Sequence, residues 1–411
     1  MKLTKTAQRL YDEFAQWEII DCHEHLPPES VRLQQKVDVF TLFGHYTRTD
    51  LVTAGMANQD YDRIQNTDLP LDLRWKIFRP HLENVRHGAY ARPAFIAAKE
   101  LFGFDDITDD NYVALSEAMQ KANTPGVYVR YLREKCKIRT SLTQCGRTDT
   151  GTDLLTPLMP MGNYTGINKW EQVEQRAAEL SERVNTLDDY LGVISKGLAK
   201  WKSEGAVGIK MAANPYGSPE RAPAHAAFEQ LRTGEVKEIV GANPLVDFLV
   251  EKTLDLAAQH DLVVAVHAGM WGDFRTLDAH HMIPIFPRHP KTRFDLYHMG
   301  MPEVRATGVI GKNNANVWLN LAWAHVISPK MTMAALDEWI DLVPVNKILA
   351  FGGDYGKPVE KVYGHLVMAR EDIATVLGRR VDDGLMTEGQ ALAVARKWFW
   401  DNPVELYRLK V

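Results

Sequence analysis

Short apolar runs, most of them followed by helical patterns, recur along this chain, most clearly in its second half. Alternation of this kind predicts a parallel sheet, and eight such units predict closure into a (β/α)8 TIM barrel. The 411 residues suit one α/β barrel with insertions. The predicted strands lie near Trp17–Cys22, Ile138–Thr143, Asp153–Met159, Ala206–Met211, Leu262–His267, Phe294–His298, Asn316–Leu321 and Lys347–Gly353, with helices such as Pro244–His260, Thr332–Leu342 and Val359–Leu377 between the later ones.

A long stretch between the first two predicted strands does not repeat the barrel pattern. It contains helical segments such as Asp110–Lys121. We therefore expect residues 1–26 and 136–411 to form the barrel, and residues 27–135 to form a mainly helical insertion, a lid over its mouth.

Charge and cysteine content exclude several classes of protein. A net charge of −5 and a pI near 6.3 argue against binding to nucleic acid or to a membrane surface. The sequence has neither a secretory signal nor a run of transmembrane length. Three cysteines give no even disulfide framework and no CxxC pair. We expect a cytoplasmic protein with a small-molecule substrate; association into a homo-oligomer is left open.

The first predicted strand ends in the sequence Asp21-Cys22-His23-Glu24-His25. Side chains two apart on a strand project from the same face, so His23 and His25 can point at one place. Two neutral imidazoles that converge in this way form half of a metal site.

Four more polar side chains stand at the carboxyl ends of later strands: Lys210, His267, His298 and Asp354. In a TIM barrel, groups from different strands converge at this end to form the active site. Such residues are poor choices for apolar strand ends on structural grounds alone, so the pattern indicates a site.

These residues resemble the signature of the amidohydrolase superfamily of metal-dependent barrels. That signature has HxH after strand one, Lys after strand four, His after strands five and six, and Asp after strand eight. In finer detail the chain is similar to the amidohydrolase-2 and uronate-isomerase-like branch, on the segments Arg293–Gly300, Phe351–Asp354 and Asn402–Tyr407.

Two imidazoles and a carboxylate suit a borderline cation such as Zn²⁺, with Mn²⁺ as the alternative. We expect His23, His25 and Asp354 to bind it, and His267 to complete the site. Asp354 is also placed to take a proton from an activated water. His298 would transfer a proton or orient the substrate.

The number of metal ions depends on Lys210. The resemblance implies that carboxylation of Lys210 would make it a bridge between two ions, with His267 and His298 holding the second. An unmodified Lys210 would instead be a cation that binds a substrate carboxylate or polarises a carbonyl. We favour one ion.

Five further residues are candidates for substrate binding. Arg48 lies in the proposed lid and could reach an anionic group. Trp271, Arg275, Trp323 and His325 follow strands five and seven, where loops carry specificity.

The leading hypothesis is a metal-dependent hydrolase that uses activated water on an amide, lactam or lactone of a small anionic substrate. The alternative keeps the barrel and the metal: a uronate-isomerase-like sugar-acid isomerase, or a decarboxylase of the same superfamily. A barrel that has lost catalysis is disfavoured, because His23, His25 and Asp354 are all present.

Overall fold

Eight parallel strands form the centre of the molecule. The computed structural model describes residues 2–411. The strands follow one another around the sheet in chain order, each parallel to its neighbour, so the predicted (β/α)8 barrel is confirmed. They are β1 (Ile19–Glu24), β2 (Ile138–Thr143), β3 (Leu155–Pro160), β4 (Gly208–Ala212), β5 (Val263–His267), β6 (Phe294–Leu296), β7 (Val317–Asn320) and β8 (Ile348–Leu349).

Backbone hydrogen bonds just beyond β8 close the ring against β1. The N–H of Cys22 donates to the carbonyl of Phe351, and the N–H of Asp354 donates to the carbonyl of His23, each at 2.9 Å. The strand β8 is shorter than predicted, because the N–H of Ala350 turns away to the carbonyl of Trp398. This closure brings the two ends of the barrel sequence together.

Strand β6 also ends earlier than predicted. It stops at Leu296, and His298 lies in a tight turn with φ of 62°, a left-handed conformation that a strand does not contain. The turn redirects the His298 side chain into the mouth of the barrel.

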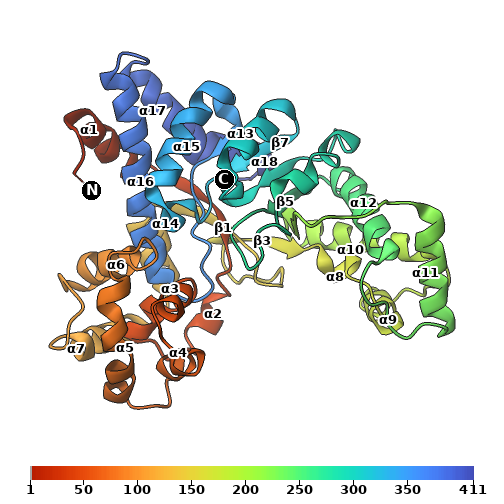
Figure 1. The fold of residues 1–411 in the computed structure, drawn as a ribbon, viewed down its shortest axis with the longest axis horizontal. Helices are drawn as coiled ribbons and strands as arrows, with labels where there is room; N and C mark the ends of the chain where they lie inside the picture. Colours follow the sequence, from red (N-terminus) through yellow and green to blue (C-terminus); the bar gives the residue numbers. More distant parts are fainter. Residues whose placement is uncertain (1) are drawn as a thin grey trace.

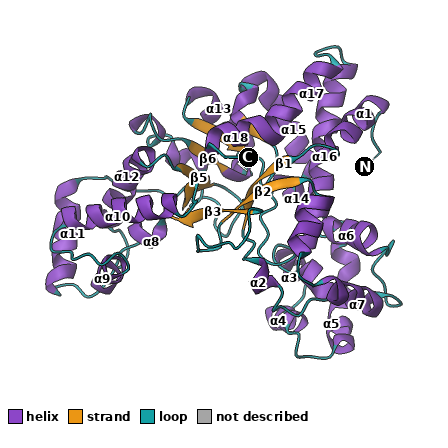
Figure 2. Cartoon of the chain, turned by 180° about the vertical axis from the view of Figure 1, so that it is seen from behind, coloured by secondary structure: helices purple, strands orange, loops and turns teal. Residues whose placement is uncertain are grey.

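Helices surround the barrel and extend from it on two sides (Figures 1 and 2). They are α1 (Lys5–Phe14), α2 (Glu29–Arg32), α3 (Thr47–Thr53), α4 (Asn58–Gln65), α5 (Leu71–Val85), α6 (Arg92–Phe102), α7 (Tyr112–Ala122), α8 (Gly162–Thr165), α9 (Trp170–Ala178), α10 (Leu187–Ser203), α11 (Arg221–Thr233), α12 (Pro244–Gln259), α13 (Val304–Asn313), α14 (Ala324–Ile327), α15 (Pro329–Leu342), α16 (Val359–Asp382), α17 (Glu388–Arg396) and α18 (Asn402–Tyr407). Among residues 2–411, none of these helices has the length and apolar character needed to cross a bilayer.

The helices α2–α7 fill the chain between β1 and β2. They form the lobe coloured orange to red in Figure 1, and a hydrophobic cluster that includes Phe40, Trp75, Phe78 and Leu115 gives it a core of its own. We propose residues 27–135 as this unit; its action as a lid stays a prediction.

A second extension is formed by α9, α10 and α11 with part of α12, on the opposite side of the barrel (Figure 1). The sequence analysis assigned these residues to the barrel and predicted no second extension. The chain between β3 and β4 and that between β4 and β5 each hold more than one helix, so the connections are longer than a minimal barrel unit.

Candidate active site

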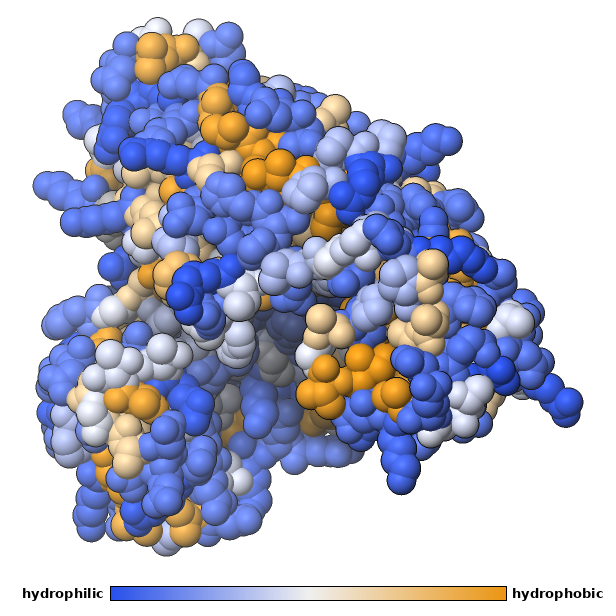
Figure 3. Space-filling view, turned by 45° about the vertical axis from the view of Figure 1, so that its right-hand side comes forward, coloured by the Kyte–Doolittle hydropathy of each residue, from blue (hydrophilic) through white to orange (hydrophobic). Residues whose placement is uncertain are grey.

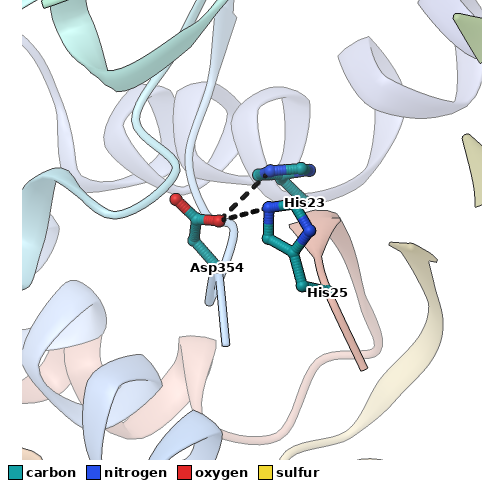
Figure 4. A group of neighbouring side chains, drawn as sticks. All are labelled: His23, His25 and Asp354. Carbon is teal, nitrogen blue, oxygen red and sulfur yellow. Dashed lines mark ion pairs between the residues drawn. The ribbon is translucent and has the colours of Figure 1, made fainter. Parts of the chain in front are cut away.

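Three side chains converge at the carboxyl ends of β1 and β8 (Figure 4). His23 lies within β1 and His25 directly follows it, so the two imidazoles share one face. Their Nε2 atoms lie 3.2 Å and 3.3 Å from Oδ1 of Asp354. His23 and Asp354 are buried, whereas the side chain of His25 is 36% exposed. Solvent therefore reaches the cluster through His25.

Left-handed backbone conformations recur around this cluster. Asp354 has φ of 62°, His298 has φ of 62° and Trp323 has φ of 65°. Such conformations cost about 1–3 kcal/mol each for a residue with a side chain and persist where the surrounding packing enforces them. The strain is thus concentrated where side chains enter the barrel mouth.

The protonation states suit metal binding. Burial, with a further contribution from Lys210, lowers the pKa of His23 to about 3. Burial alone would raise the pKa of Asp354, but His23 and His25 beside it lower that pKa well below its usual range. His23 is therefore neutral and Asp354 anionic at neutral pH, which are the forms that bind a cation.

Lys210 lies at the middle of β4, two residues before the strand ends at Ala212 and not at the carboxyl end predicted for it, and its side chain reaches the same place. Its Nζ donates to Nε2 of His23 at 2.8 Å and lies 4.4 Å from the centre of the Tyr297 ring. Burial lowers the pKa of Lys210 to about 8, against the opposing effect of Asp354. The amine is therefore a buried cation that needs little energy to lose its proton.

His267 and His298 form a separate pair. Nδ1 of His298 lies 2.9 Å from the carbonyl oxygen of Ala322, which can only accept, so this nitrogen carries the proton. Nε2 of His298 then accepts from Nδ1 of His267 at 3.0 Å. Burial lowers the pKa of both rings, that of His267 to about 4. By this inference, Nε2 of His267 holds a free lone pair, and it has no hydrogen-bond partner among residues 2–411.

The donor set fits a divalent transition metal. One ligand atom from each of His23, His25 and Asp354 lies within 4.8 Å of the others, which gives two nitrogens and one oxygen. Three protein ligands with room for further ones are typical of catalytic zinc sites. Nδ1 of His25 lies 2.9 Å from the carbonyl oxygen of Gln144, a contact that orients the ring for metal binding through Nε2. The metal's identity, the number of ions and the part of His267 stay predictions.

Comparison with known families agrees with this arrangement. Residues 196–409 match the family model described as Amidohydrolase (Amidohydro_2), which is more than half of the chain. The chain belongs to this amidohydrolase family. Its predicted membership is thus confirmed, and with it the prediction of an enzyme from a metal-dependent superfamily. No curated protein matches its sequence.

Solved structures resemble the amidohydrolase over nearly its whole length. A uronate isomerase from Thermotoga maritima has a TM-score of 0.80 at 17% identity, with 98% of each chain covered. A glucuronate isomerase from Caulobacter crescentus has a TM-score of 0.78 at 16% identity, covering 99% of this chain and 94% of that one. A putative metal-dependent hydrolase from Lactobacillus casei has a TM-score of 0.65 at 16% identity, with 97% of each chain covered.

The five residues predicted to bind the substrate do not lie in one place. Trp323 contacts His298, with ring centres 5.2 Å apart, and Trp271 lies 6.4 Å from Trp323. Arg275 is exposed and paired with Asp273. Their roles in binding stay predictions.

His325 and Arg48 have other partners. His325 is fully buried, and both of its ring nitrogens are engaged, by Asp372 and by the carbonyl of Ala350. Arg48 donates to Asn58 and lies over the ring of Tyr61 within the insertion. Neither side chain brings a free polar atom to His23, His25 or Asp354. The substrate-binding roles of His325 and Arg48 stay predictions.

Sequence reasoning did not single out Tyr46. This buried residue precedes α3 and stacks on Trp323, with ring centres 4.3 Å apart. Burial and the nearby Asp354 carboxylate raise the pKa of Tyr46 well above its usual value, so the phenol keeps its proton. The only hint in the sequence was that Tyr46 lies two residues before Arg48. Its approach to Asp354 depends on how the insertion packs, so no sequence pattern indicates it.

A large hollow lies between the insertion and the loop after β8, and none of His23, His25 or Asp354 lines it. It has a volume of about 770 Å³ and is lined by residues of the insertion, such as Asp38 and His45, and by Gly356 and Lys357 of the loop after β8. The space-filling view shows a deep indentation between the lobe at lower left and the rest of the molecule (Figure 3).

Proposed function

We propose that this amidohydrolase interconverts the aldose and ketose forms of a uronate or a similar sugar acid, at a site that binds one divalent metal ion. The observation that carries the proposal is the extent of the likeness to uronate isomerases. It covers 98% of both chains in the Thermotoga protein and therefore includes the insertion, whereas the family model begins at residue 196. A uronate isomerase from Bacillus halodurans adds a third example, with a TM-score of 0.73 at 13% identity.

The reaction moves hydrogen within one molecule and needs no co-reactant. The C–H bond at C2 of the aldose breaks, and its proton passes to a base. Its electron pair forms a C1=C2 double bond while the C1 carbonyl oxygen gains a proton, which gives an ene-diol. A proton then adds to C1, O2 loses its proton, and C2 becomes the carbonyl of the ketose. Atoms and charge balance without water.

The chain supplies a proton acceptor and a hydrogen-bond donor for these proton transfers. Nε2 of His267 offers a lone pair at the barrel mouth, and His298 behind it fixes the ring by accepting the Nδ1 proton. The protonated Tyr46 phenol is a hydrogen-bond donor beside Asp354. A metal ion held by His23, His25 and Asp354 would polarise the substrate carbonyl as a Lewis acid.

Lys210 is the cation that binds the substrate's carboxylate in this proposal. Its amine lies at the cluster and, with a pKa of about 8, is mostly protonated at neutral pH. A compact ammonium at this depth favours an anionic substrate group over a neutral one.

Hydrolysis is the second candidate. It is favoured by the full-length likeness to the putative metal-dependent hydrolase and by the anionic Asp354, which can accept a proton from water. In this case, the substrate is the predicted amide, lactam or lactone, and the metal again acts as the Lewis acid.

Product analysis in deuterated water separates these reactions. The metal-loaded enzyme would be incubated with glucuronate, galacturonate and a panel of lactones and amides, and followed by NMR. We expect a ketose product with deuterium at C1. Lactone or amide cleavage without any isomerisation would overturn the proposal in favour of hydrolysis, and loss of CO₂ would overturn it in favour of decarboxylation.

Matched variants link the product to the site. His267→Asn should reduce isomerisation strongly, because the asparagine amide cannot take up a proton at neutral pH. His225→Asn, on the exposed face of α11, should leave the rate unchanged. Equal rates in His267→Asn and the unaltered enzyme would remove His267 from the mechanism.

A further inference from the structure

A second hollow lies between the insertion and the loops after β5 and β7. Its volume is about 450 Å³. Aromatic and aliphatic side chains dominate its lining, and we call it the aromatic cleft. Its main side chains are Tyr46, Tyr90, Met270, Trp271, Phe274 and Trp323.

The aromatic cleft is next to the reaction site, because Trp323 lines the cleft and also contacts His298. One contact of this indole is His298, at 5.2 Å between ring centres, and another is Tyr46, stacked at 4.3 Å. Tyr90 lies nearly parallel to Trp323, with 6° between the ring planes. Trp323 is 2% exposed and none of His23, His25 or Asp354 lines the cleft, so a ligand that occupies both places must pass beside this buried indole.

Two large aromatic side chains at the cleft are left exposed. Trp271 is 59% exposed and Phe274 is 46% exposed, both on the loop after β5. Exposed aromatic side chains gathered at a concave site mark a surface that gains from being covered. The Nε1 of Trp323 is buried and has no acceptor among residues 2–411.

Charge limits the kind of ligand. Asp50 is the acidic residue in the lining, and no lysine or arginine lines the cleft. A carboxylate or phosphate would be repelled there, whereas Lys210 favours an anion at the histidine cluster. The two sites thus suit opposite ends of one molecule.

We propose that the aromatic cleft is a substrate subsite for a neutral, apolar ring, aryl or alicyclic, joined to the acid that binds at the metal site. The inference rests on the proposed metal site at His23, His25 and Asp354, and not on which reaction occurs there: a free uronate would leave the cleft empty, and an acid that carries such a ring would fill it. It identifies Trp271 and Phe274 as specificity-determining residues.

The test compares carboxylates that differ only in the ring. Binding of propionate, 3-cyclohexylpropionate and 3-phenylpropionate to the metal-loaded protein would be measured by ligand-observed NMR titration. Covering a six-membered ring is expected to tighten binding at least about tenfold relative to propionate, since each buried methylene contributes severalfold. Equal affinity for all three acids would overturn the proposal.

Variants assign the effect to the cleft. Trp271→Ala and Phe274→Ala should each reduce the preference for ring-bearing acids several-fold while propionate binding is unchanged, which also shows that the variants are folded. Trp271→Phe should retain most of the preference for ring-bearing acids. Leu385→Ala removes a 66% exposed apolar side chain outside the cleft and should change nothing. A ring preference that survives both alanine variants would place the ring elsewhere.

The ring-selectivity test and the isomerase assay can fail independently of each other. Failure to isomerise uronates with ring selectivity intact would refute the proposed reaction and keep the subsite. Isomerisation of simple uronates with no ring selectivity would refute the subsite alone.

Discussion

The backbone N–H of Asp354 donates to the carbonyl oxygen of His23 at 2.9 Å. One hydrogen bond thus joins the first and last strands of the barrel at the two residues whose side chains also meet, 3.2 Å apart. A contact that closes the barrel therefore also positions two of the candidate metal ligands. Changes that loosen the loop after β8 should affect both.

Gly353 tests this coupling. A Cβ atom there would lie 1.9 Å from Oε1 of Glu24, a buried carboxyl that accepts the N–H of Tyr355. We expect Gly353→Ala to lower the free energy of unfolding by about 1–3 kcal/mol, as overpacking does, and also to weaken metal binding. Urea unfolding and metal titration measure the two effects.

Gly389→Ala is the matched control, because nothing lies within 4 Å of the added methyl group. It should leave metal affinity unchanged and leave stability equal or slightly higher. If Gly353→Ala were destabilised but bound metal normally, closure and site assembly would be independent.

Replacing Asp354 by Asn should remove most metal binding. The variant keeps the size of the side chain but loses the anionic oxygen that both Nε2 atoms face. Even outer-shell changes cost about 10–100-fold in affinity, so we expect a loss of about 100-fold or more. Metal content after dialysis measures it, with the exposed Asp153→Asn as control. Unchanged metal content in Asp354→Asn would exclude this carboxylate as a ligand.

Most of the barrel could be predicted, and so could the meeting of His23, His25 and Asp354, because both follow from local patterns. The strand β2 is as predicted, and parallel strands place their carboxyl ends at one edge wherever they lie in the sequence. His23 and Asp354 are far apart in the chain, yet barrel topology alone predicts that they meet.

What could not be predicted depends on packing between distant segments. Tyr46 belongs to the insertion, and no pattern indicates that it stacks on Trp323. The left-handed turn at His298 follows an apolar run that reads as continuous strand. Both features depend on contacts between segments that are distant in the sequence, and both shape the site.

The stability of the fold should depend on pH through Asp295. This carboxyl on β6 is fully buried, and burial raises its pKa to about 7, although Tyr407 and Asn320 donate to it. The folded state therefore holds a proton that the unfolded state releases near pH 4. Its contribution to stability is fully present below pH 4 and is lost as pH rises towards 7.

Asp295→Asn should flatten this dependence. Between pH 5 and 7 the unaltered protein should lose up to about 1.4 kcal/mol more per pH unit than the variant. Chemical denaturation at several pH values gives both slopes, and the other titrating groups cancel in their difference. Parallel curves for the two proteins would mean that Asp295 titrates normally.

A buried ion pair joins the insertion to the barrel. Arg32 of α2 donates to Glu360 of α16 at 2.5 Å, and both side chains are 1% exposed. Arg32→Met leaves a carboxylate buried without its cation and should cost about 3–5 kcal/mol. The double variant Arg32→Met/Glu360→Gln should be more stable than this single variant, because no net charge is then left in the interior.

Urea denaturation of the single and double variants measures the coupling. The control is Lys36→Met in the exposed Lys36–Asp68 pair, which is expected to change stability by less than about 1 kcal/mol. A double variant no more stable than Arg32→Met would show that the pair does not hold the insertion on the barrel.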